Sequence, residues 1–170
     1  MLNRSATRLL AVFVFAAVAG GAAAASAEPR GKIVSYGRYE IVEAGKPEKA
    51  ERTVAGEVKP VENRRLIQQT DEVVGQLGNT FGIEVDLEGL PPGSVNLVVR
   101  TIHPPLTNSE TGRTMTVSEY DWPVVGRSRV YFGFTFEYRW EIAEGIWTKQ
   151  LIYNGKVLAE KKFKVIVPLN

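Results

Sequence analysis

The stretch from Arg129 to Val167 constrains the fold most strongly, because it predicts three consecutive β-strands. In the first of them apolar and polar side chains alternate with a period of two, which is typical of a strand with one buried face. The buried face is predicted to carry an aromatic row, Phe132, Phe134, Phe136, Tyr138 and Trp140, and the other face Tyr131, Gly133, Thr135, Glu137 and Arg139. Asn154-Gly155 separates the second strand from the third and predicts a two-residue hairpin turn, since both positions tolerate positive φ. The C-terminal part therefore predicts an antiparallel β-meander.

The chain before residue 129 also predicts β-strands separated by turns and loops. The strands predicted there span residues 32–42, 66–77, 81–88, 95–102 and 114–122, with a weaker one at 53–60. The spacing of apolar residues in 66–77 fits neither the helical period nor the strand period well, and we favour a strand. A long polar loop is expected from His103 to Arg113, because Pro104 and Pro105 lack the N–H group that a sheet interior requires.

This tally predicts an all-β fold of seven to nine strands, arranged as an antiparallel β-sandwich. An up-and-down barrel has the same local signals and remains an alternative. In antiparallel order, successive turns fall at opposite ends of the domain. The turns at 89–93, 123–128 and 154–155 are expected at one end, and the loops at 103–113 and 143–145 at the other.

The N-terminus reads as a signal-peptide helix rather than as part of the domain. Arg4 and Arg8 precede an apolar stretch that begins at Leu9, and Ala25-Ser26-Ala27 fits the small-x-small cleavage pattern. Cleavage after Ala27 would leave a single domain at residues 28–170, with its sharpest pattern at 66–167. An uncleaved membrane anchor is the alternative, although the Gly/Ala-rich second half of the stretch is weakly apolar for a span. The expected location is periplasmic or secreted, with no membrane span after cleavage.

Charge and cysteine content restrict the functions of the exported chain. The signal segment carries two arginines and no acidic residue, so residues 28–170 have 19 basic and 19 acidic residues and no net charge. A nucleic-acid partner is therefore not expected. The chain has no cysteine, which excludes disulfides, thiol catalysis and cysteine-ligated metals.

Two segments resemble a known family. The sequences TDEVVGQLGNTFGIEVDLEGLPPG and GIWTKQLIYNGKVLAEKKFKV, which lie between residues 70 and 165, are similar to those of an uncharacterised family of exported bacterial proteins with a domain of unknown function. The resemblance implies export and an immunoglobulin-like sandwich. It implies no activity, because that family has no established catalytic residues.

No constellation with a recognisable chemistry appears. His103 is the only histidine, and a serine triad would have to combine it with Ser94, Ser109 or Ser118, none of which lies in a G-x-S-x-G elbow. Glu84, Asp86 and Glu88 alternate along one strand and form an ordinary solvent-facing row rather than a calcium loop. We therefore expect no enzyme, no catalytic residue, no cofactor and no metal.

The best surface candidate is the turn after residue 122. Tyr120, Trp122, Arg127 and Arg129 combine aromatic and arginine side chains, the composition of binding hot spots. An equally weighted alternative is that Trp122 folds back onto the core. The sequence thus predicts a non-catalytic periplasmic binding or accessory module for an envelope protein or a polymer such as peptidoglycan or a polysaccharide. The alternative is a carrier whose interior, lined by the aromatic row, holds an apolar small ligand.

Overall fold

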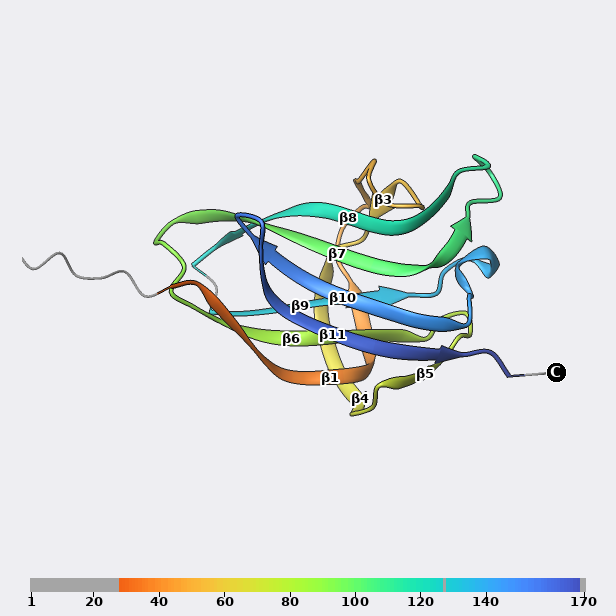
Figure 1. The fold of residues 1–170 in the computed structure, drawn as a ribbon, viewed down its shortest axis with the longest axis horizontal. Coiled ribbons are helices and arrows are strands. Elements are labelled where there is room, and N and C mark those ends of the chain that lie inside the picture. The colour runs from red at the N-terminus through yellow and green to blue at the C-terminus, as the bar shows by residue number, and fades with distance from the viewer. Residues whose placement is uncertain (1–27, 127, 169–170) are drawn as a thin grey trace, which may run out of the picture.

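The computed structural model describes residues 28–126 and 128–168, and these residues are almost entirely β-structure (Figure 1). The strands are β1 (Arg30–Glu43), β2 (Glu48–Lys49), β3 (Glu57–Val58), β4 (Val61–Gln68), β5 (Glu72–Val74), β6 (Thr80–Glu88), β7 (Ser94–Thr107), β8 (Thr114–Val125), β9 (Arg129–Thr135), β10 (Gly145–Tyr153) and β11 (Lys156–Ile166). A short 3₁₀ helix, η1, spans Arg139–Glu141. The predicted signal-peptide helix lies outside the described residues.

Two sheets form the body of the domain. The first has the strand order β4-β1-β6-β9 and the second the order β5-β11-β10-β7-β8, while β2 and β3 pair only with each other. The two main sheets hold nine strands, within the predicted range. Pairing is antiparallel except between β5 and β11, where Glu72 lies opposite Lys164 in a parallel ladder. Because the sheets keep separate edge strands, the architecture is a sandwich and not a closed barrel.

Interlocking aromatic rings fill the space between the sheets. Phe81 on β6 contacts Phe163 and Trp147 of the facing sheet, with ring centroids 5.0 and 5.8 Å apart. Phe136 packs against the same Trp147 at 5.6 Å, nearly perpendicular to it. All four side chains are fully buried, so burial of apolar area and edge-to-face contacts stabilise this centre.

The aromatic row was predicted to be longer than it is. Phe132 and Phe136 are buried, but Tyr138 and Trp140 leave the sheet and stack on each other, with ring planes 6° apart. The reason is that β6 begins at Thr80, opposite Thr135, so β9 has no ladder partner beyond that point. The chain turns into η1 instead.

Tyr131 was assigned to a solvent-facing side and is in fact buried. The second half of β1, paired with β4, turns out of the sheet and crosses behind β6 and β9 (Figure 1). The turn follows register shifts in β1, and there Gly37 adopts a φ of +135°, which disfavours any other residue. Two side chains of this ribbon lie against the Tyr131 ring. The Tyr39 ring centroid is 4.8 Å from the Tyr131 ring centroid, and the Arg64 guanidinium carbon is 5.4 Å from it.

One loop prediction and one strand prediction also need correction. Pro104 and Pro105 lie inside β7, at a register shift between Ile102 and Leu106 where the ladder to β8 is interrupted. The β10 ladder ends at Ile102, so neither proline removes a hydrogen bond from that side. The predicted strand at 66–77 is divided between β4 and β5.

The turns do lie at the predicted ends of the sandwich. The connections β6–β7, β8–β9 and β10–β11 are at the left of Figure 1, and the β7–β8 and β9–β10 connections at the right. Asn154 and Gly155 have φ values of +48° and +78°, as the predicted hairpin requires.

Candidate functional site

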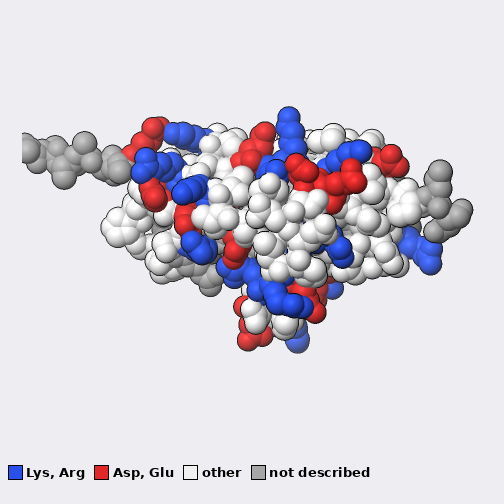
Figure 2. Space-filling view, turned by 90° about the horizontal axis from the view of Figure 1, so that it is seen from below, with Lys and Arg blue, Asp and Glu red and all other residues white. Residues whose placement is uncertain are grey.

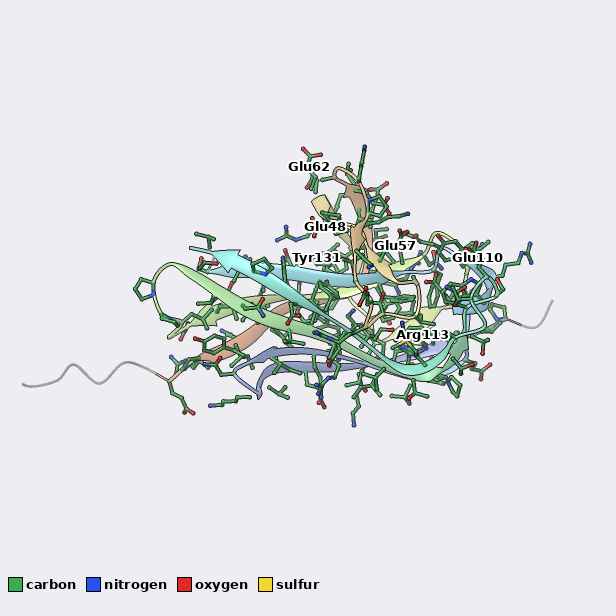
Figure 3. All side chains as sticks on the ribbon, turned by 90° about the horizontal axis from the view of Figure 1, so that it is seen from above. Glu48, Glu57, Glu62, Glu110, Arg113 and Tyr131 are labelled. Carbon is green, nitrogen blue, oxygen red and sulfur yellow. The ribbon has the colours of Figure 1, made fainter. Side chains whose placement is uncertain are left out.

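A cleft of about 730 Å³ runs over β9. The edge strands β8 and β9 form its two sides, and the segment 44–60, which contains β2 and β3, covers it. This cover segment projects from the body of the molecule beside Tyr131 (Figure 3). The cleft therefore lies at the open side of the sandwich, where the two sheets are not joined by a shared strand.

Backbone and side-chain hydrogen bonds hold the cover segment against β8 and the residue before it. The Glu119 N–H donates to the Arg52 carbonyl at 2.9 Å, and the Arg113 guanidinium donates to the Glu51 carbonyl at 2.6 Å. The Val54 side chain is buried, and its N–H donates to the Ser118 hydroxyl at 3.2 Å. Gly45 and Gly56, near the two ends of the segment, have φ values of +69° and +80°. Glycine supplies this left-handed backbone at no steric cost.

A buried lysine forms the floor of the cleft. The Lys149 side chain points inward from β10 and is only 1% exposed. Its amine donates hydrogen bonds to the Thr101 hydroxyl at 2.7 Å and to the Gly133 carbonyl at 2.9 Å. Both acceptors are uncharged, and within residues 28–126 and 128–168 Lys149 forms no salt bridge. Burial alone lowers the pKa of the Lys149 amine to about 7.

A row of polar residues extends from Lys149 across the inner face of the second sheet. Lys149 lies opposite Thr101 on β7, which lies opposite Ser118 on β8. The Ser118 hydroxyl is 3.0 Å from Nε2 of His103, while Nδ1 is 2.8 Å from the Pro104 carbonyl. Because that carbonyl can only accept, Nδ1 carries the proton and Nε2 accepts from Ser118.

This serine and histidine have the spacing of a nucleophile and its base, yet other features argue against catalysis. A backbone carbonyl occupies the place of the orienting carboxylate, and burial lowers the pKa of His103. Ser118 is itself buried under Val54, whose N–H engages its oxygen. The pair therefore fits a structural link between β7, β8 and the cover segment.

Three of the four predicted surface residues line the cleft. Tyr120 and Trp122 project from β8, and Arg129 begins β9. Arg127 lies outside the described residues. Tyr120 and Trp122 are half-buried and pack against the core, so Trp122 both contacts the core and faces the cleft. Phe132 and Phe134 from the predicted row complete an apolar wall.

The rim is charged but internally compensated. Among the described residues, eight acidic and six basic residues line the cleft. Arg52 pairs with Glu119 and Asp121, at 3.3 and 3.0 Å. The other paired cations are Lys59 with Glu137 and Glu43, Arg64 with Glu84, Arg129 with Asp86, and Lys49 with Glu51. Of the six cations, Lys149 is thus the one without an acidic partner in the described structure. The same mixing of signs is visible on the face shown in Figure 2.

Glu141 is a second buried titratable group at this cleft. Its carboxylate accepts the Glu137 and Tyr138 N–H groups, at 2.7 and 2.9 Å, and so caps η1. Burial raises its pKa to about 7, and these two hydrogen bonds oppose the shift. Glu137 in turn pairs with Lys59, which fixes the cover segment to the η1 turn.

The acidic row on β6 is engaged in ordinary contacts. Glu84 binds Ser35 and Arg64, and Asp86 binds Arg129. Residues 28–126 and 128–168 contain no cluster of three or more potential metal ligands. In the same residues, no helix is long and apolar enough to cross a membrane.

Comparison with known proteins places the chain in a family. The model of a family described as a domain of unknown function, DUF3859, matches residues 28–165. The chain belongs to this family. That result confirms the resemblance noted in the sequence. No curated protein matches the chain.

A solved structure supports the fold. An immunoglobulin-like protein from Pseudomonas aeruginosa is similar to 84% of this chain and 99% of its own, with a TM-score of 0.61 and 26% identity. An alkylpurine DNA glycosylase from Pseudomonas fluorescens, bound to DNA containing an abasic-site analogue, matches 56% of this chain and 27% of its own. Its TM-score is 0.35 at 15% identity, a likeness too weak to support any inference.

Sequence reasoning missed the floor of the cleft. Lys149 falls between Trp147 and Leu151 on the inward-facing positions of its strand, and a lysine on that face was the available signal. Nothing in the sequence indicated that residues 44–60 would cover β9, because their position follows from the turn of the β1–β4 ribbon.

Proposed function

We propose that the protein is a non-catalytic, exported binding module that holds a ligand, or a segment of an envelope partner, in the cleft over β9. The observation that carries this proposal is the buried Lys149 at the floor of the cleft, which has no acidic partner among the described residues. An unpaired buried amine lowers the stability of the fold. If the Lys149 amine binds an acceptor group of a ligand, that role explains why a lysine occupies this buried position.

Export is part of the same proposal. The family match begins at residue 28, immediately after the expected cleavage site at Ala27. Partners would be an envelope protein or a polymer such as peptidoglycan or a polysaccharide. Half-buried aromatic side chains such as Trp122 are suited to either, because they offer a large apolar face at low entropic cost.

A carrier of an apolar small ligand is the second candidate. Phe132 and Phe134 on the cleft wall favour it. The centre of the sandwich, however, is filled by the rings of Phe81, Phe136, Trp147 and Phe163. A carried ligand would therefore lie in the cleft over β9 rather than between the sheets.

The test is to titrate isotope-labelled protein, purified from the envelope of cells expressing the full chain, with fractionated envelope extract. Amide resonances would be followed by NMR. The proposal predicts saturable shifts at β8, β9 and residues 44–60, and their loss in Trp122→Ala. Trp140→Ala is the matched control, because Trp140 is also half-buried but does not line the cleft. Shifts confined to other surfaces, or equal loss in both variants, would contradict it.

A further inference from the structure

We infer that the cleft binds a monocarboxylate with an apolar body, whose carboxylate is recognised by the Lys149 amine. This inference rests on the proposed function, because it names the ligand chemistry of the same site. It is argued from the donors at the floor, the charges at the rim and the side chains of the walls.

The floor offers an unfilled donor. A protonated amine carries three N–H groups, and the described residues accept two of them, through Thr101 and the Gly133 carbonyl. Both acceptors are neutral, and the amine also lies 5.6 Å from the centroid of the Phe132 ring. Among the described residues, no carboxylate therefore compensates the positive charge. A carboxylate supplies an acceptor and a compensating charge together, and a charge-assisted hydrogen bond in a water-poor site is the stronger kind.

The rim limits the charge of the ligand to one. Acidic residues outnumber basic residues around the cleft, and Arg52, Arg64 and Arg129 are each held by carboxylates of the chain itself. A phosphomonoester would bring about two negative charges to a site whose described residues include several acids and one cation without an acidic partner. A polyanion would be repelled by the same acids.

The walls select the body of the ligand. The half-buried Phe134 and Trp122 present apolar surface beside the polar floor, and the buried Phe132 lies behind them. A pocket of this size accommodates a small molecule, and pockets of this kind combine an apolar lining with a few polar groups that fix orientation. One charged head and one apolar body match this arrangement.

The test uses three probes that share a ten-carbon chain, namely decanoate, decanamide and decyl phosphate. Affinities are measured by isothermal titration calorimetry at pH 6, where the Lys149 amine is predominantly protonated. Decanoate should bind about tenfold more tightly than decanamide, because only the acid forms the charge-assisted bond. It should also bind more tightly than decyl phosphate. In Lys149→Met the preference for acid over amide should disappear, whereas Lys162→Met, an exposed lysine on β11, should keep it.

A measurement on the unaltered protein keeps the test independent of whether the variant folds. The pKa of Lys149, followed through the ¹³Cε signal, should rise on saturation with decanoate and stay constant with decanamide. Equal affinities for acid and amide, an acid preference that survives in Lys149→Met, or tighter binding of decyl phosphate would overturn the inference. If acid and amide bind equally but shift β8 and β9 resonances, the cleft remains a binding site. If neither probe nor envelope extract shifts them, the proposed function fails as well.

Discussion

Replacement of Lys149 by methionine should change how the stability of the fold depends on pH. The Lys149 pKa is about 7 in the folded protein and has an ordinary value of 10.5 when exposed. Between these pH values the unfolded chain binds more protons than the folded one. The wild type therefore gains stability as the pH rises from 7 to 10.5, by at most about 1.4 kcal/mol per pH unit and about 4 kcal/mol over the window.

Methionine has a similar volume and no charge, so the variant lacks this dependence. It also leaves the Gly133 carbonyl and the Thr101 hydroxyl without the lysine, which costs about 1–3 kcal/mol at every pH. At pH 7 the variant should be more stable than the wild type by about 1–3 kcal/mol, because the desolvation cost exceeds the lost hydrogen bonds. Near pH 10.5 the order should reverse.

Urea unfolding followed by tryptophan fluorescence measures these differences, since Trp147 is fully buried. Lys162→Met controls for the titration of other groups, because Lys162 is exposed. The decisive quantity is the change in the difference between variant and wild type from pH 7 to 10.5. A difference that stays constant across that range would refute the claim that Lys149 is held desolvated in the folded protein.

Other substitutions test separate parts of the structure. Glu141→Gln should stabilise the protein at pH 8 by about 1–3 kcal/mol and have little effect near pH 4. The reason is that the folded-state pKa is raised to about 7, so wild-type stability falls as the pH rises from 4.5 to 7; urea unfolding at both pH values checks this. Tyr131→Phe should be neutral or stabilising by up to about 1 kcal/mol in thermal unfolding, because the buried Tyr131 hydroxyl has no hydrogen-bond partner among the described residues. Gly133→Ala should destabilise by about 2 kcal/mol or more, since its Cβ would collide with that hydroxyl and lie 2.9 Å from the Phe81 carbonyl. Tyr131→Phe should rescue part of this loss in the double variant, and no rescue would contradict the assignment of the clash.

Local rules predicted much of the fold. The Asn154-Gly155 turn and the alternation in β6 and β7 depend on neighbouring residues only, and the structure confirms them. In β10 every residue from Trp147 to Ile152 is buried, so both faces of that strand are covered. The prediction failed for Tyr138 and Trp140, because a strand persists only where a partner strand continues. The partner strand β6 begins at Thr80, so its pairing with β9 stops at Thr135. This limit depends on a contact between residues about 55 positions apart in the sequence.

The candidate site was predictable in part. Tyr120, Trp122 and Arg129 were chosen by composition and do line one cleft. Lys149 belongs to the same site because two strand pairings bring it, Thr101 and Ser118 into one row. The burial of Tyr131 follows from the β1–β4 ribbon, whose pairing with β6 ends at Tyr39, and alternation within β9 contains no information about it.

The pairing of β1 also has a consequence for the order of folding events. Arg30 pairs with Glu88, and β5 joins β11 through Glu72 and Lys164, so both sheets depend on contacts between distant parts of the chain. Such topologies fold slowly, typically in milliseconds to seconds, because loop closure precedes the gain from pairing. We expect the β10–β11 hairpin to form early, and the β1–β6 and β5–β11 pairings, which join residues 58 and 92 positions apart, to form late. Stopped-flow refolding with pulse-labelled amides would show late protection in β1 and β5. Until β1 joins, β6 has an open edge on that side, and nascent molecules at high concentration would associate through it.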